Sequence, residues 1–228
     1  MQKRDSRLIM QNLSVFKHVS MTSAVATEPT IEKRVTPEMQ AQERGWALAA
    51  QRGDQKAFMR LVEAYQRPVY NLCYRMLGDQ VEAEDAAQET FLRAYTRLES
   101  YNPDRKFSSW LLSIASHYCI DRLRQRRHQM VSWDELPPWQ GVPDMAPQPE
   151  EAALSRETQT AVHKLLQSLP GDYRAAMVLR YWHEMPYEEI AETLDTSVSA
   201  IKSRLFRARQ MLAEAAQHAQ ALPVRPNG

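Results

Sequence analysis

A basic stretch near the C-terminal end of the chain carries the side chains best suited to contact nucleic acid. Residues 198–213 contain four Lys or Arg residues and no acid. At helical spacing, polar and aromatic side chains share one face of this stretch: Ser199, Lys202, Ser203, Phe206 and Arg207. Such a face, near the start of a helix, can donate hydrogen bonds to base edges in the major groove of DNA.

The residues before this stretch predict a helix-turn-helix. A short helix over 187–194, a turn at 195–197 and a long helix from 198 place apolar side chains where two crossing helices bury them. These side chains are Ile190, Ala191, Leu194, Val198, Ile201 and Leu205. The alternative is a helical hairpin whose arginine-rich surface only faces solvent. Upstream, 153–169 fits an amphipathic helix, and Asp172 is the expected N-cap of a helix through Tyr181.

A second helical region is predicted over residues 45–128. Apolar residues recur at helical spacing over 46–65, 79–99 and 107–127, and Pro68 fits the first turn of a separate helix that ends at Gly78. The helix over 79–99 has a core stripe and an opposite face with Asp85, Gln88, Glu89 and Leu92. Carboxylates around an apolar centre fit either a protein interface or a solvated surface.

A turn and a basic helix follow in the same region. Residues 101–106 form the turn, which contains Asn102-Pro103. The helix after it carries a narrow polar stripe with His117 and Arg124 and ends in several arginines, including Arg127. Cations there complement the helix dipole, and they can be merely solvated or can contact phosphates.

The remaining segments connect or flank these two regions. Residues 129–152 contain five acids, five prolines and no Lys or Arg, which predicts an extended linker. This segment is either a spacer or an acidic arm for a cationic groove. Residues 1–44 and 220–228 have no sustained periodicity and are expected to be tails. The predicted fold is therefore all-α, with small helical domains at 45–128 and 153–219 joined by an extended acidic, proline-rich linker.

Several function classes are disfavoured by what the chain lacks. Its 6 Gly residues form no phosphate-binding loop, and Cys73 and Cys119 have no metal-ligand spacing. Both cysteines are expected to be small buried residues in a reducing compartment. No stretch is long and apolar enough for a membrane span or a signal peptide, so a cytoplasmic protein is expected. We expect no catalytic residue, metal or cofactor.

The order of motifs resembles the extracytoplasmic-function (ECF) sigma factors of bacterial RNA polymerase. In the first domain the matching runs are DQKAF at 54–58, VYNL at 69–72, YRMLGD at 74–79, AEDAAQETFLRAY at 83–95, FSSWL at 107–111 and IDRL at 120–123. In the second they are SLP at 168–170, YR at 173–174, YEEIAE at 187–192 and KSRLFRAR at 202–209. Two matched domains in family order are far more specific than any single motif.

The resemblance implies a promoter-specificity subunit without an active site of its own. It assigns core polymerase binding to Asp85, Gln88, Glu89 and Leu92. It assigns the single-stranded minus-ten element to Tyr101, Asn102, Asp104, Arg105, Lys106, His117, Asp121, Arg124 and Arg127. It assigns the duplex minus-thirty-five element to Ser199, Lys202, Ser203, Arg204, Phe206, Arg207 and Arg209. The implied partners are the clamp and flap regions of core RNA polymerase, promoter DNA and an anti-sigma factor, and binding energy alone would support DNA melting.

Three positions depart from the family pattern, and two other functions compete. His117 stands where Asn is frequent, Asp195 replaces a turn Gly, and Pro186 replaces a capping Ser. Asp tolerates the left-handed conformation that such a turn requires. One alternative is a helix-turn-helix regulator that binds an operator as a dimer, which leaves the Asp85–Leu92 face unexplained. The other is a hydrolase using buried Asp and His, for which no pair converges at motif spacing.

Overall fold

The computed structural model describes residues 37–131 and 161–221, and all regular structure within these two segments is helical. We call residues 37–131 the N-terminal block and residues 161–221 the C-terminal block. Almost all of the predicted acidic linker and most of both predicted tails lie outside the described residues. The all-α fold with two small helical domains is confirmed.

The N-terminal block is a bundle built around α3. Its elements are α2 (Pro37–Gln51), α3 (Gln55–Leu77), α4 (Gln80–Thr96), the short 3-10 helix η4 (Leu98–Ser100) and α5 (Phe107–Val131). Helix α2 begins inside the stretch predicted as a tail, and α5 continues past the predicted end of the domain at residue 128. Large apolar side chains from α3, α4 and α5, among them Leu61, Leu72, Phe91 and Leu111, are fully buried between the helices.

Pro68 does not start a new helix, so that prediction is wrong. Helix α3 runs through it from Gln55 to Leu77. A proline inside a helix removes one backbone hydrogen bond and costs about 3 kcal/mol. Leu61 and Tyr65 before it and Val69 and Leu72 after it are all buried in the same core. Packing of one continuous face against α4 and α5 therefore outweighs the local cost.

The boundaries around α3 follow from side-chain caps and one glycine. Asp54 accepts hydrogen bonds from the backbone N–H groups of Lys56 and Ala57, at 2.9 and 3.2 Å, which caps α3. Gly78 ends α3 in the left-handed conformation, with φ of 86°. Asp79 then accepts from the N–H of Glu82 at 2.9 Å and caps α4. These short-range signals fix the α3–α4 turn.

The C-terminal block contains the helix-turn-helix. Residues 161–167 are helical, followed by α7 (Gly171–Tyr181), α8 (Tyr187–Thr193) and α9 (Val198–Ala221). Asp172 is not the N-cap of α7: that position belongs to Pro170, and Asp172 lies in the first turn, where its carboxylate pairs with Arg124. Pro186 occupies the N-cap position of α8 and makes no side-chain hydrogen bond there. Asp195 adopts φ of 47° in the turn, as its place in the motif predicts.

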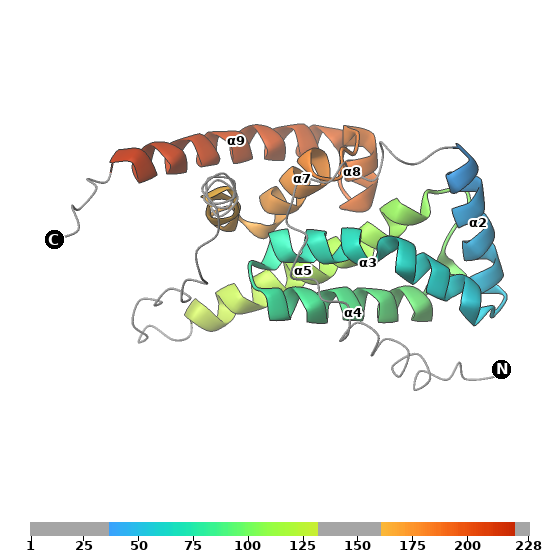
Figure 1. Cartoon of the computed structure of the whole chain (residues 1–228). Helices are drawn as coiled ribbons and strands as arrows, with labels where there is room; N and C mark the ends of the chain where they lie inside the picture. Colours follow the sequence, from blue (N-terminus) through green and yellow to red (C-terminus); the bar gives the residue numbers. More distant parts are fainter. Residues whose placement is uncertain (1–36, 132–160, 222–228) are drawn as a thin grey trace, which may run out of the picture.

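The two blocks pack directly against each other through α3, α5, α7 and α8. In Figure 1, α7 and α8 lie between α9 and the N-terminal bundle, while α4 lies on the far side of that bundle. Buried residues of both blocks form one hydrophobic core, which includes Met76 and Leu112 on one side and Leu179 on the other. The α7, α8 and α9 helices therefore pack on the side of the N-terminal bundle opposite α4.

Candidate nucleic-acid interface

The long helix α9 presents an exposed polar face, as the sequence predicts. Ile201, Leu205 and Ala208 are buried against α7 and α8, which fixes the rotation of the helix about its axis. Before it, the hydroxyl of Ser197 accepts a hydrogen bond from the N–H of Ala200 at 3.1 Å and caps the helix. The exposed residues on the opposite face are Ser199, Lys202, Ser203, Phe206, Arg207 and Arg209, and Arg204 is half-buried.

Phe206 is the unusual member of this face. It is 57% exposed and is one of the few large apolar side chains of the described residues that lie open to solvent. It stands beside Arg207, Lys202 and Ser203. An apolar ring among hydrogen-bond donors suits a DNA groove, where it can contact a thymine methyl group while the donors meet base edges.

Tyr101 is not available for DNA contact in this structure, unlike the other residues predicted in its loop. Its ring is 3% exposed and packs on Phe107 and Trp110, with ring centroids 5.4 and 5.2 Å away. Its hydroxyl donates to the backbone carbonyl of Arg105 at 2.6 Å. Because an aromatic side chain in this position buries a large apolar area, it shapes the loop and does not face outward.

The rest of that loop is exposed and held by short-range hydrogen bonds. The Asn102 side chain accepts from the N–H of Asp104 at 3.0 Å, and the N–H of Arg105 donates to the carbonyl of Asn102 at 3.0 Å. Asp104 also pairs with Arg44 of α2 at 3.0 Å. The side chains of Asn102, Asp104, Arg105 and Lys106 thus sit on a rigid turn at the surface.

Helix α5 carries the remaining predicted minus-ten residues along one exposed stripe. His117, Asp121, Arg124 and Arg127 are all exposed, at helical spacing. The Nδ1 atom of His117 donates to the carbonyl of Ser113, 2.9 Å away, which points its other ring nitrogen away from the helix backbone. Arg124 lies 3.7 Å from Asp121 and 3.2 Å from Asp172 of α7.

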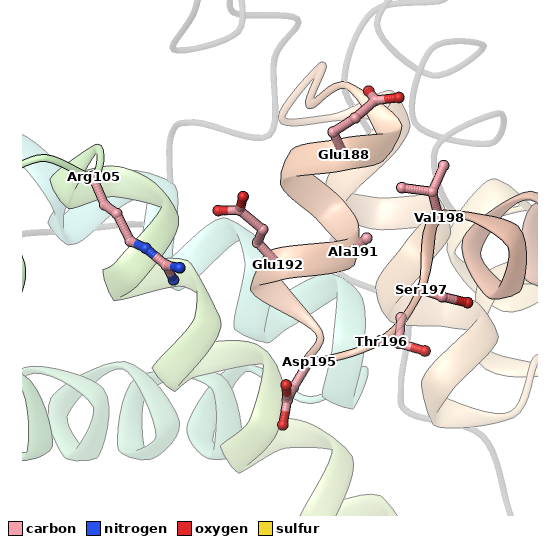
Figure 2. Close-up of a pocket in the computed structure, with 8 residues that line it drawn as sticks. All are labelled: Arg105, Glu188, Ala191, Glu192, Asp195, Thr196, Ser197 and Val198. Atoms are coloured by element: carbon pink, nitrogen blue, oxygen red, sulfur yellow. The ribbon is translucent and has the colours of Figure 1, made fainter.

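A shallow cavity of about 470 Å³ separates the loop from the helix-turn-helix. Figure 2 shows Arg105 on one side and the residues of α8 and the following turn on the other. The opposite wall includes three carboxylates, those of Glu188, Glu192 and Asp195. The structure therefore brings part of the predicted minus-ten surface against the acidic helix of the other block.

The predicted polymerase-binding residues share the outer side of α4. Asp85 is exposed, and Gln88, Glu89 and Leu92 are half-buried, while Ala83, Ala87 and Phe91 on the opposite side lie in the core. Glu89 is fixed by an ion pair with Arg93 at 2.7 Å, and Arg93 in turn stacks over the ring of Tyr118. Val81, 68% exposed, extends this face toward the start of the helix. The result is a surface on which Asp85, Gln88 and Glu89 lie between the apolar side chains of Val81 and Leu92.

Sequence reasoning missed the residues that join the blocks. Arg174 of α7 is buried and donates to the carbonyls of Met76, Gln167 and Leu169. His163 stacks on Tyr74 with centroids 4.7 Å apart, and Arg75 lies over the ring of Trp182 at 5.1 Å. Burial lowers the pKa of Arg174 to about 10, with a smaller effect from the charge of nearby Arg126. The motif YR marks Arg174, but nothing local indicates its partners.

The described residues show neither a metal cluster nor a membrane span. No group of three or more His, Cys, Asp or Glu side chains among them could hold a metal ion. Cys73 and Cys119 are buried, and their mutual hydrogen bond is the largest cause that raises the pKa of Cys73. None of the helices in the described segments is long and apolar enough to cross a membrane.

Comparison with known proteins identifies both blocks. The family model for Sigma-70 region 2 matches residues 61–129, and that for Sigma-70, region 4 matches residues 159–212. The chain is 39% identical over 168 residues to the ECF RNA polymerase sigma factor SigW of Bacillus subtilis, covering 71% of this chain and 89% of that one. It is 35% identical over 185 residues to the RNA polymerase sigma-H factor of Pseudomonas aeruginosa, covering 78% and 95%.

Two solved structures share the fold. CnrH, in complex with the cytosolic domain of CnrY, superposes with a TM-score of 0.57 at 23% identity, covering 78% of this chain and 98% of that one. The sigma factor RpoE of Bartonella quintana, in complex with the anti-sigma factor NepR, superposes with a TM-score of 0.55 at 21% identity, covering 71% of this chain and 98% of that one. The chain belongs to the family of ECF RNA polymerase sigma factors, which are transcription regulators. Its N-terminal and C-terminal blocks contain sigma regions 2 and 4.

Proposed function

We propose that this sigma factor binds core RNA polymerase through α4 and reads two promoter elements, one with each block. The C-terminal block would read the minus-thirty-five element as duplex, and the N-terminal block would hold the minus-ten element as single strand. The observation that carries this proposal is the exposed, basic and hydrogen-bonding face of α9 on a correctly capped helix-turn-helix.

Recognition of duplex DNA by α9 would divide between base edges and phosphates. Lys202 and Arg207 are exposed on the face that also carries Phe206, and Arg side chains favour bidentate bonds to guanine. The guanidinium of Arg209 is held by a hydrogen bond from its Nε to the carbonyl of Leu205 at 3.2 Å. A guanidinium fixed against its own helix is suited to a phosphate at a set distance, so Arg209 would position the helix.

Opening of the promoter would be supported by capture of the unpaired strand. Unstacking a base costs a few kcal/mol, which contacts to the extruded base and the backbone can offset. The turn at 101–106 and the stripe on α5 provide such contacts, with Lys106, Arg124 and Arg127 for phosphates and His117 and Asn102 for bases. Tyr101 would contribute by holding the turn in shape from beneath.

The outer face of α4 would dock on the polymerase clamp, and α9 would approach its flap. Helix α4, which carries Asp85, Gln88, Glu89 and Leu92, lies on the far side of the N-terminal bundle from α7, α8 and α9 (Figure 1). This position would leave both DNA-contacting surfaces available once the chain is bound to polymerase. Charged residues around Leu92 would contribute to orientation and association rate more than to affinity.

Regulation would follow the family pattern. The RpoE structure of similar fold contains an anti-sigma factor, and we propose that a protein of this kind binds the present chain and masks its functional surfaces. Its place of action would be the cytoplasm, where polymerase and promoters are found.

The experiment that tests the proposal is transcription with purified core polymerase and fragmented genomic DNA, with RNA starts mapped in the presence and absence of the full chain. Discrete new starts that share two upstream elements would support it and would reveal both sequences. Absence of new starts, with folded protein and active polymerase, would contradict it. Binding to palindromic sites as a dimer would then favour the operator-binding alternative.

A further inference from the structure

The basic side chains that the proposed function assigns to the minus-ten strand are met by carboxylates of the C-terminal block. The ammonium of Lys106 lies 2.9 Å from one carboxylate oxygen of Glu189, and the hydroxyl of Ser109 donates to the other. The Glu189 side chain is only 14% exposed. Both oxygens of this carboxylate are therefore used to hold α8 against the start of α5.

One further ion pair repeats the pattern, and a third cation lies across a cavity from acidic residues. The guanidinium of Arg124 reaches both oxygens of Asp172, at 3.2 and 3.4 Å. Arg105 lines one side of the shallow cavity in Figure 2 and Glu188, Glu192 and Asp195 line the other, with the Glu192 side chain pointing toward Arg105. Carboxylates of α7 and α8 thus pair with two cations of the predicted single-strand surface, and acidic residues share a cavity with a third.

This arrangement cannot persist on a promoter. The minus-ten and minus-thirty-five elements are about 25 base pairs apart, or about 85 Å along the duplex at 3.4 Å per base pair. In the closed arrangement the two surfaces belong to blocks that pack directly against each other through α3, α5, α7 and α8. The blocks must separate to reach both elements, and residues 132–160 have enough chain to span up to about 100 Å.

The polar face of α9 remains exposed in the closed arrangement. Lys202, Phe206 and Arg207 are all exposed while Lys106 and Arg124 are paired with the other block. Closure therefore affects the two DNA-contacting surfaces differently. It occupies cations of the single-strand surface and leaves the duplex-reading surface accessible.

We propose that acidic residues of the C-terminal block, with Glu189 at the centre, act as an internal competitor that masks the minus-ten surface of the chain outside the polymerase complex. Separation of the blocks when polymerase binds would remove the carboxylates paired with Lys106 and Arg124 and those across the cavity from Arg105, and so free these charges for the melted strand. The inference rests on the proposed function for the identity of that strand. The contact between the blocks itself does not depend on it.

The first test measures the distance between the blocks in the full chain without polymerase. Spin labels are placed on Lys56→Cys and Gln210→Cys, both at exposed positions, while Cys73 and Cys119 are buried. Glu189→Lys places two ammonium groups together, so the interlabel distance should lengthen and its distribution broaden. The exchange Glu189→Lys/Lys106→Glu restores the opposite charges and should return the original distance, which shows that any opening arises from this pair and not from misfolding.

The second test measures binding of a fluorescent single-stranded DNA 20-mer of mixed sequence, again without polymerase. Glu189→Lys should bind at least fivefold more tightly than Glu63→Lys, a matched control that makes the same charge change at an exposed site on α3. Glu189→Gln, which introduces no new cation, should also bind more tightly than the unmodified chain. Equal affinities for Glu189→Lys and Glu63→Lys would overturn the proposal, as would an unchanged interlabel distance.

These outcomes are separable from failure of the proposed function. Tighter single-strand binding by the Glu189 variants in a chain that directs no transcription would support masking and contradict the polymerase role. Transcription from discrete promoters together with no response to Glu189 substitution would support the role and contradict masking.

Discussion

The guanidinium of Arg174, in the C-terminal block, donates a hydrogen bond to the backbone carbonyl of Met76, in the N-terminal block. The same side chain bonds to the side-chain and backbone oxygens of Gln167 and to the carbonyl of Leu169. Gln167 in turn donates to the carbonyl of Arg75 at 3.1 Å. One buried cation therefore joins the end of α3 to the turn before α7.

Arg174→Lys should destabilise the closed arrangement, because an ammonium group cannot reach all of these acceptors at once. Leaving buried carbonyls unpaired costs about 2 kcal/mol in the free energy of unfolding. The measurement is chemical denaturation of the full chain. Arg209→Lys, an exposed residue on α9, serves as the control and should change stability little. Equal effects of the two substitutions would show that Arg174 does not join the blocks.

Gly78→Ala should also loosen this junction. Gly78 has φ of 86°, and a Cβ there would lie 2.8 Å from the side chain of Gln167. Moving Gln167 would break its bonds to Arg75 and Arg174, and the left-handed backbone adds about 1–2 kcal/mol of strain for an L-residue.

The matched control is Gly45→Ala, which lies in α2 with no atom near the added Cβ. That substitution should raise stability by up to about 1 kcal/mol because alanine favours the helix. The measurement is thermal unfolding of both variants, compared with that of the unmodified chain. A stabilising Gly78→Ala would mean that Gln167 can move without loss.

The sequence predicts the parts of the fold that depend on short stretches of chain. The glycine stop at Gly78 and the left-handed Asp195 were both predicted, and each is set by a few neighbouring residues. The exposed face of α9 is also predictable, because the spacing of Ile201 and Leu205 determines which side of the helix is buried. These features carry the recognition of a helix-turn-helix.

Contacts between distant segments were not predictable in this way. Glu189 and Lys106 have opposite charges, but 83 positions separate them and nothing local indicates their pairing. The resemblance assigned Tyr101 to the minus-ten strand, whereas packing against Phe107 and Trp110 buries its ring. At Pro68 the local rule predicted a boundary, and packing along α3 overrode it. Long-range packing determines all three.

The α4 face gives a prediction that separates the sigma role from operator binding. Asp85→Ala/Gln88→Ala should reduce affinity for core polymerase at least tenfold while the helical content stays unchanged, because both side chains point away from the core. Glu84→Ala, at another exposed position of α4, is the control. Binding to immobilised core polymerase is the measurement. Unchanged affinity in the double variant would place the polymerase interface elsewhere.

His183 gives a prediction on pH. It is buried, neither ring nitrogen has a hydrogen-bond partner, and burial, with a smaller effect from Arg75, lowers its pKa to about 3 from an ordinary value of 6.5. Between these values the unfolded chain takes up a proton that the folded chain does not. Proton uptake by His183 in the unfolded chain therefore lowers the free energy of unfolding as pH falls below about 6.5, by up to about 1.4 kcal/mol per pH unit.

His183→Leu should remove that part of the acid dependence. The stability difference between the variant and the unmodified chain, measured by denaturation at several pH values, should grow in favour of the variant from pH 6.5 to pH 5. The same measurement on His117→Leu, which removes a histidine from an exposed site, is the control. A difference that stays constant with pH would mean that His183 becomes protonated in the folded chain.

Arg207 and Arg209 are both exposed arginines on α9, but we expect them to contact different parts of the DNA. If Arg207 makes bidentate bonds to guanine, Arg207→Ala should weaken use of the minus-thirty-five element by about 1–3 kcal/mol and relax specificity at one base pair. Arg209→Ala should weaken binding to all duplexes by similar factors and reduce the salt dependence by about one phosphate contact. Transcription from promoters with single substitutions in the minus-thirty-five element, run at several salt concentrations, distinguishes the two. Equal losses on every sequence for Arg207→Ala would make it a phosphate contact and would leave base reading to Lys202 and Phe206.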